Sequence, residues 1–148
     1  MKPRLIRRTI IILALAVAPS AFAQSHKATD DSVYQAWGGA AGIRAVIEDF
    51  VPRVKADARI GAFFKDINSK HLVQQLSTQL CQVSGGPCAY DGSSMKEAHN
   101  GLDIHKAHFN ALVEVLQASM DAKGIPFSAQ NGMLALLAPM HRDIISRP

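Results

Sequence analysis

The sequence is poor in cysteine and aromatic residues, and it lacks the short motifs of several common catalytic sites. Its 148 residues include 2 cysteines, 1 tryptophan and 2 tyrosines. It contains no serine nucleophile elbow, no phosphate-binding loop, no paired catalytic carboxylates and no His-x-x-x-His zinc motif. These absences argue against a serine hydrolase, a P-loop nucleotide-binding protein and a zinc peptidase.

The N-terminus has the three-part pattern of a secretory signal peptide. "MKPRLIRR" carries four basic residues and no acid, the apolar run "TIIILALAVA" follows, and "PSAFA" supplies the small residues Ala21 and Ala23. We expect cleavage between Ala23 and Gln24, which makes residues 1–23 a signal peptide and predicts a periplasmic or secreted protein. An uncleaved anchor is the alternative, but the apolar run is too short to span a bilayer comfortably. No cysteine follows the run, which argues against a lipoprotein.

Removal of this segment also removes the excess of positive charge. The whole chain has 16 basic and 12 acidic residues, and 12 of each remain after residue 23. The sequence shows no basic patch of the kind that binds nucleic acid, so we expect no nucleic-acid partner. Contact with a membrane is expected only through the signal peptide before cleavage.

Export changes the interpretation of the two cysteines. Cys81 and Cys88 lie in "LCQVSGGPCAY", and in an oxidising compartment an even number of cysteines indicates a disulfide. An unbroken helix would hold them roughly 10 Å apart, too far for a bond, but Gly85-Gly86-Pro87 lets the chain turn back. We therefore predict a Cys81–Cys88 disulfide. The spacing does not suit a zinc site.

The apolar spacing after a short linker (24–32) predicts one all-α domain, residues 33–148. Apolar residues recur three and four positions apart, and we find no period-two alternation, repeat or low-complexity tract. A first short helix is expected to begin near Ser32 and to end at Gly38-Gly39. Further helices are expected over 41–55, 69–84, 94–100 and 103–123, and from 128 through 145.

One histidine, His99 in "SSMKEAHNGLDI", lies in a short predicted helix between a loop and a glycine. Met95 is one turn earlier, so the two side chains share a helix face with aliphatic neighbours. A buried neutral imidazole with one free nitrogen is a natural metal ligand. A lone helical histidine is more often structural, however, and the residues alone leave both interpretations open.

Four ordered segments together resemble the group I truncated haemoglobins, the short bacterial two-over-two globins. They are "VYQAWGGAAGIRAVIEDF", "RVKADARIGAFF", "GGPCAYDGSSMKEAHNGLDI" and "HFNALVEVLQASMDAKGIP", and with their connections they cover nearly all of the chain after the signal peptide. The resemblance implies a two-over-two helical sandwich around haem, with His99 binding the haem iron. Because no Cys-x-x-Cys-His is present, we expect haem b held without a covalent bond.

The resemblance also assigns residues to the haem pocket. Lys96 is expected to pair with a haem propionate, with a solvated lysine as the alternative, and Tyr90 to reach the same edge. Phe64 is expected to pack on the porphyrin face. The complete set expected to contact haem is Phe50, Val51, Phe64, Leu72, Leu76, Tyr90, Met95, Lys96, His99, Ile104 and Phe109.

The distal side departs from the family pattern. Group members commonly have a tyrosine directly after the phenylalanine of the second helix, where this chain has Val51. The two distal positions on the third helix correspond to Leu72 and Leu76, and the family often has glutamine at the second. Loss of a hydrogen bond to bound oxygen, about 1–3 kcal/mol, would speed its release roughly 5- to 150-fold.

Other polar residues are expected to contribute less to the pocket. Gln75 and Gln79 are expected to point away from the iron, and His71 is a candidate internal sixth ligand. His105 and His108 are expected to share a surface face.

These features predict a periplasmic haem globin that reversibly binds O₂, NO and CO at a pentacoordinate iron. An apolar pocket suits NO or CO better than stable storage of O₂. The family implies oxidation of NO to nitrate, and the missing tyrosine predicts that such dioxygenase activity, or a peroxidase-like activity, is weak. An electron donor would be required for turnover, and the sequence does not identify it. A periplasmic haem carrier and a haem-free globin-like interaction module are the alternatives.

Overall fold

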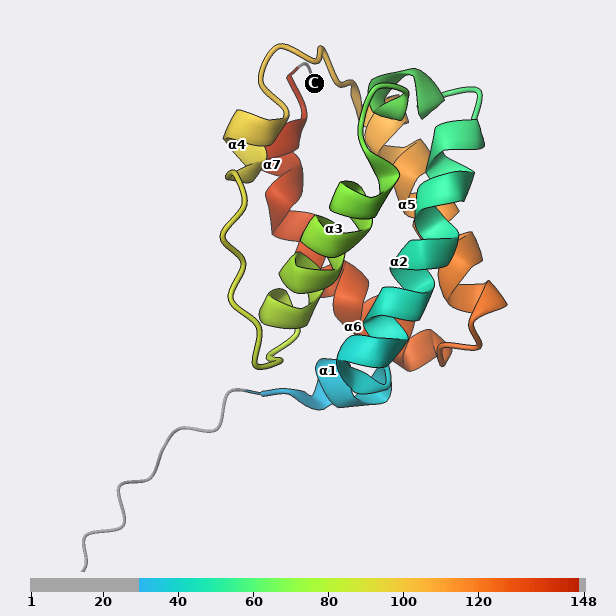
Figure 1. The fold of residues 1–148 in the computed structure, drawn as a ribbon, viewed down its shortest axis with the longest axis vertical. Helices are drawn as coiled ribbons and strands as arrows, with labels where there is room; N and C mark the ends of the chain where they lie inside the picture. Colours follow the sequence, from blue (N-terminus) through green and yellow to red (C-terminus); the bar gives the residue numbers. More distant parts are fainter. Residues whose placement is uncertain (1–29, 147–148) are drawn as a thin grey trace, which may run out of the picture.

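The computed structural model describes residues 30–146, which form α-helices and short 3-10 helices without a β-strand among them (Figure 1). In chain order the elements are α1 (Ser32–Ala36), α2 (Gly39–Ala56), η1 (Gly61–Phe64), α3 (Ser69–Val83), α4 (Met95–Ala98), α5 (Lys106–Ala122), α6 (Phe127–Leu137), η2 (Ala138–Met140) and α7 (His141–Ile144). The prediction of an all-α fold is confirmed. The predicted signal peptide, its cleavage point and most of the linker lie outside the described residues.

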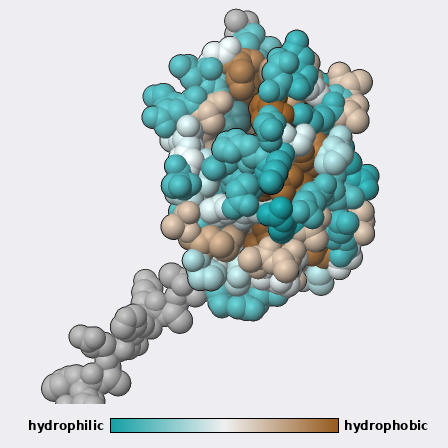
Figure 2. All heavy atoms as spheres, in the orientation of Figure 1, coloured by the Kyte–Doolittle hydropathy of each residue, from teal (hydrophilic) through white to brown (hydrophobic). Residues whose placement is uncertain are grey.

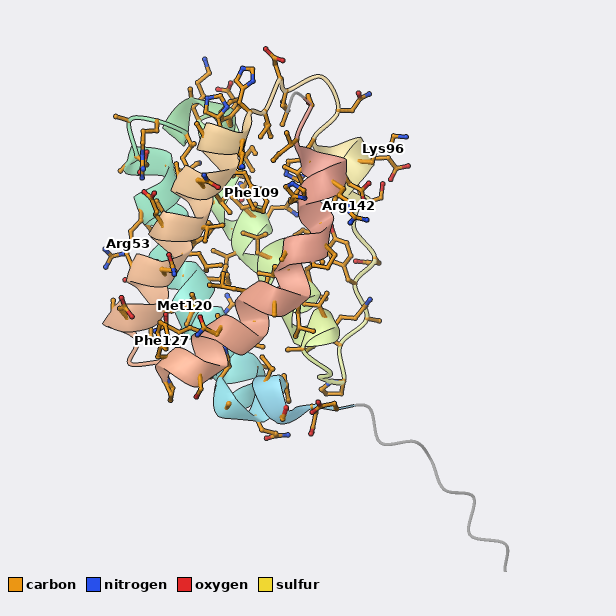
Figure 3. The ribbon with its side chains drawn as sticks, turned by 180° about the vertical axis from the view of Figure 1, so that it is seen from behind. Arg53, Lys96, Phe109, Met120, Phe127 and Arg142 are labelled. Atoms are coloured by element: carbon orange, nitrogen blue, oxygen red, sulfur yellow. A yellow bond between two sulfur atoms is a disulfide. The ribbon has the colours of Figure 1, made fainter. Side chains whose placement is uncertain are left out.

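The long helices form two layers. In Figure 1, α2 and α3 lie in front of α5 and of the α6–α7 segment, and Figure 3 shows the same arrangement from behind. Helix α2 packs against both α3 and α5. Trp37, only 1% exposed, fixes the corner before α2 because its Nε1 donates to the Ala129 carbonyl of α6 at 3.0 Å. The buried face of α2 consists of Ile43, Val46, Ile47, Phe50, Val51 and Val54.

Two helices have different bounds from those predicted. Helix α5 begins later than expected, because Asp103 has a φ of 50° and His105 is extended, with a φ of −98° and a ψ of 164°. The helix expected from 128 through 145 begins at Phe127 and is interrupted by η2. Pro139 lies in that 3-10 turn, and its nitrogen has no hydrogen to donate to the preceding helical turn. Leu136, an apolar residue of α6, is 39% exposed.

The segment after α3 returns along that helix to α4 (Figure 1). The sulfur atoms of Cys81 and Cys88 lie at bonding distance, with Cα atoms 5.8 Å apart. Gly85 makes the turn possible: its φ is +89°, and a Cβ there would lie 2.5 Å from the Asp30 carbonyl oxygen. The predicted pairing therefore holds the start of the 88–94 segment against the end of α3. Among residues 30–146, no helix has both the length and the apolar character needed to cross a bilayer.

Candidate functional site

A cavity of about 700 Å³ lies between the two helix layers. Its walls come from α2, η1, α3, residues 90–93, α4, α5 and the α6–α7 segment, and most of the lining side chains are apolar. Figure 2 shows apolar surface within a cleft whose rims are hydrophilic. This volume lies within the range of about 300–1,000 Å³ that is usual for small-molecule and cofactor sites.

His99 is a lining residue of this cavity, and one of its two ring nitrogens is already hydrogen-bonded. Its Nδ1 lies 2.7 Å from the Met95 carbonyl oxygen, and its side chain lines the cavity. Because a carbonyl oxygen only accepts hydrogen bonds, Nδ1 carries the proton and Nε2 keeps its lone pair. A second hydrogen bond of this kind orients a metal-binding imidazole and raises its basicity. His99 is therefore prepared to bind a metal through Nε2.

The short helix before His99 is held by its own N-terminal capping box. The Ser94 hydroxyl accepts from the Glu97 amide at 3.2 Å, and the Glu97 carboxylate accepts from the Ser94 amide at 2.9 Å. The hydrogen bonds from the side chain and backbone of Ser94 lower the pKa of Glu97. His99 itself is the C-cap of α4, and its amide bonds to the Met95 carbonyl at 3.2 Å. The capping box thus fixes the helical turn that supplies the carbonyl partner of the His99 ring.

The structure gathers most of the predicted pocket residues around the cavity, but not Val51 or Lys96. Val51 is 1% exposed and faces a smaller cavity beside Val73, between α2 and α3. Lys96 is exposed, and Figure 3 shows its side chain pointing away from the helix bundle. The predicted residues that line the large cavity are Phe50, Phe64, Leu72, Leu76, Tyr90, Met95, His99, Ile104 and Phe109.

Two glutamines were placed wrongly from the sequence. Gln75 and Gln79 were expected to point away from the site, yet both line the cavity. His71, which also lines it, precedes Gln75 by one turn, so the three residues form one stripe along α3. The regular four-residue spacing of these polar residues, directly beside the Leu72, Leu76 and Leu80 stripe, is the sequence signal that identifies them.

His108 was also expected on a surface face but lines the cavity. Its Nδ1 accepts from the His105 amide at 3.2 Å, and its ring centroid lies 5.0 Å from that of Phe63. The His105 side chain is 43% exposed and does not line the cavity. The two rings nevertheless lie side by side, with centroids 5.1 Å apart, so His105 flanks the cavity-lining His108 on its exposed side.

The metal-binding side chains around the cavity suit haem better than a metal ion held by protein ligands alone. Within residues 30–146, no group of three or more His, Cys, Asp or Glu side chains is placed to hold a metal ion. Haem brings four nitrogen ligands of its own, so its iron requires a single protein ligand and an apolar space for the porphyrin. His99 and the apolar cavity provide both.

The comparisons with known proteins first define the class of the chain. Residues 32–146 match the bacterial-like globin family, so the chain belongs to that family. Its relatives include group 1 truncated hemoglobins. The protein of this name from Mycolicibacterium paratuberculosis is 31% identical, over 82% of this chain and 90% of its own. That from Tetrahymena thermophila is 35% identical, over 64% of this chain and 78% of its own.

Solved structures give the same result. The Fe(III) form of truncated hemoglobin from Tetrahymena pyriformis matches with a TM-score of 0.74 and 30% identity, over 78% of this chain and 98% of that chain. A hemoglobin from Synechococcus sp. PCC 7002, solved with covalently attached heme, matches with a TM-score of 0.72 and 23% identity and supports the fold alone. The chain is thus a truncated globin, and this family implies an iron-containing haem and the binding of diatomic gases.

Proposed function

We propose that this chain is an exported globin that would hold haem b without a covalent bond, with His99 as the protein ligand of its iron, and that it reversibly binds diatomic gases. The observation that carries this proposal is the Nδ1 hydrogen bond of His99 to the Met95 carbonyl, which leaves Nε2 free inside an apolar cavity. The group 1 truncated hemoglobins that resemble the chain support the same assignment.

The protein's own residues position and shield the cofactor. His99 would hold the haem, which would supply an iron able to bind O₂, NO or CO. Phe50 from α2, Phe64 from η1 and Phe109 from α5 line the cavity and give it apolar walls on three sides. The Phe109 ring is itself packed edge to face on His141, with centroids 5.9 Å apart.

Binding and detoxification of NO is the proposed physiological role. Leu72 and Leu76 line the cavity but cannot donate a hydrogen bond, and Val51 does not reach it. Gln75 and Gln79 also line it, but the Gln79 amide lies against the sulfurs of Met95 and Met140. Ferrous haem binds NO with little need for such a donor, whereas bound O₂ gains much from one. We expect slow or incomplete turnover when the O₂-loaded ferrous protein is mixed with NO. Fast stoichiometric formation of nitrate with sustained turnover would show an efficient dioxygenase instead.

Export to the periplasm is supported by the N-terminal sequence pattern and by the paired cysteines. Cys81 is 1% exposed, and its bond to Cys88 is of the kind that persists in oxidising compartments. N-terminal sequencing of the protein from a periplasmic fraction is expected to begin at Gln24. An intact N-terminus in the membrane fraction would support an uncleaved anchor.

The test of haem binding uses the mature chain from Gln24, titrated with haem and examined as the ferric, ferrous and ferrous-CO forms. We expect a one-to-one complex whose Soret band is lost or strongly shifted in His99→Ala. His105→Ala is the matched control, because His105 does not line the cavity, and its spectra are expected to equal those of the wild type. A wild-type chain that takes up no haem would refute the proposal. Rapid transfer of haem to apomyoglobin would favour the haem carrier.

A further inference from the structure

The methionines of the chain fall into two groups, one at the cavity and one in the closed core. The sequence has 5 methionines, of which Met1 belongs to the predicted signal peptide. Met95 and Met140 are half-buried and line the cavity. Met120 and Met133 are 0% exposed and do not line it. Because both cysteines are joined in a disulfide, Met95 and Met140 are the thioethers or thiols of the described chain that a small oxidant in the cavity can reach.

The sulfur atoms of these two residues meet at one hydrogen-bond donor. The Nε2 atom of Gln79 lies 3.4 Å from the Met95 sulfur and 3.8 Å from the Met140 sulfur, although one methionine belongs to α4 and the other to η2. A thioether sulfur is only a weak acceptor. The oxygen of a methionine sulfoxide is a much better one, so the same amide would hold the oxidised side chain in place.

Met95 also belongs to the turn that supports His99. Its carbonyl oxygen lies 2.7 Å from the His99 Nδ1, and its side chain lines the same cavity. Oxidation to the sulfoxide converts a flexible apolar side chain into a polar one. Because most of the cavity wall is apolar, a sulfoxide beside His99 would oppose the burial of an apolar porphyrin.

We propose that Met95 and Met140 are a paired site of reversible oxidation by hydrogen peroxide, and that this oxidation blocks the uptake of haem by the haem-free chain. The thioether sulfur attacks one peroxide oxygen, an S–O bond forms and the O–O bond breaks. The other oxygen takes up the second proton and leaves as water, so the sulfur supplies the two electrons that reduce the peroxide. A methionine sulfoxide reductase reverses the change. The block on haem uptake rests on the proposed function, because it requires haem in this cavity, whereas the oxidation does not.

The first measurement follows the oxidation of the mature, haem-free chain in hydrogen peroxide. Peptide mass spectrometry gives the rate at which each methionine gains one oxygen atom, and Met120 and Met133 are internal controls. We expect Met95 and Met140 to be oxidised at least about 10-fold faster than either control, because the oxidant reaches exposed sulfur first. Equal rates at all four positions would overturn the proposal.

The second measurement is haem uptake after catalase has removed the peroxide. We expect the oxidised wild type to bind haem about 10-fold more weakly, the effect of a polar group buried in an apolar site. The variant Met95→Leu/Met140→Leu nearly conserves side-chain volume and should bind haem equally before and after peroxide. Met120→Leu/Met133→Leu is the matched control and should lose affinity as the wild type does. The two single variants of the cavity pair replace the double variant if it does not bind haem untreated.

Unchanged haem affinity in the oxidised wild type would overturn the proposed block, and so would an equal loss of affinity in Met95→Leu/Met140→Leu. Failure of the untreated wild type to bind haem would refute the proposed function and, with it, the block on haem uptake. In that case the four oxidation rates would still decide whether the cavity methionines are the site of oxidation.

Discussion

Removal of the Cys81–Cys88 cross-link should destabilise the protein and loosen one wall of the cavity. The bond closes a loop with a sequence separation of 7, and loop-closure entropy assigns such a cross-link about 2.5 kcal/mol. For a domain of this size, that loss corresponds to a fall in melting temperature of about 10 °C. Residues 90–93, which line the cavity, follow Cys88 directly, so the loss should also speed the release of haem.

The assay is urea unfolding of the haem-free wild type, with and without a thiol reductant, beside the double variant Cys81→Ala/Cys88→Ala. The reduced wild type and the double variant are expected to have similar free energies of unfolding, both below that of the oxidised wild type. Reductant should change nothing in the double variant, which serves as the control. Equal unfolding midpoints for the oxidised and reduced wild type would refute the expected loss of stability. Equal rates of haem transfer to apomyoglobin would refute the expected faster release of haem.

Three further outcomes are expected. The pKa of Asp57 is lowered to about 2, chiefly because the Arg59 side chain donates to its carboxylate. Because this pKa lies below the value of about 3.9 in the unfolded chain, the ionised carboxylate stabilises the folded protein. That stabilisation is complete above the unfolded pKa and is lost as the pH falls toward 2. Asp57→Asn should therefore lower the free energy of unfolding at pH 7 and flatten its fall between pH 5 and 2, and an unchanged pH profile would contradict this. Gly92→Ala places a methyl group 2.4 Å from the Gln75 oxygen and 2.4 Å from the Tyr90 hydroxyl oxygen; both are ends of flexible side chains that can move aside, so it should cost less than about 1 kcal/mol of stability, measured by urea unfolding, and a larger loss would show that the wall is rigid. Extraction with acid and an organic solvent should remove all haem from the protein, whereas haem retained on the chain would indicate a covalent bond.

The main helices and the turn between the cysteines could be predicted because single local signals determine them. The apolar spacing of α2 matches its buried face, and the Gly85-Gly86-Pro87 break produces the turn that brings Cys88 back to Cys81. The starts of α5 and α7 could not be predicted. They depend on the positive φ of Asp103, which apolar spacing does not indicate, and on the 3-10 turn that contains Pro139, a break that the helix expected from 128 through 145 did not take into account.

The candidate site was less predictable than the fold. The residues around His99 left both roles open and favoured the structural one, and the assignment to haem came from the family resemblance. Gln75 was misplaced because the cavity faces a wide arc of α3, whereas a single apolar stripe predicts a narrow one. Val51 is buried as expected for an apolar residue, but its hydrophobicity does not tell which of two neighbouring cavities it faces.

Rescue of His99→Gly by free imidazole is the most direct test of the central claim, that the Nε2 atom of His99 holds the iron. The variant removes the imidazole but keeps the Met95 carbonyl that bonds Nδ1 in the wild type at 2.7 Å. We predict that His99→Gly loses the wild-type spectrum of the ferrous form and that added imidazole restores it, with saturation at one equivalent per cavity. A His99→Gly protein whose ferrous and ferrous-CO spectra equal those of the wild type without imidazole would contradict the account.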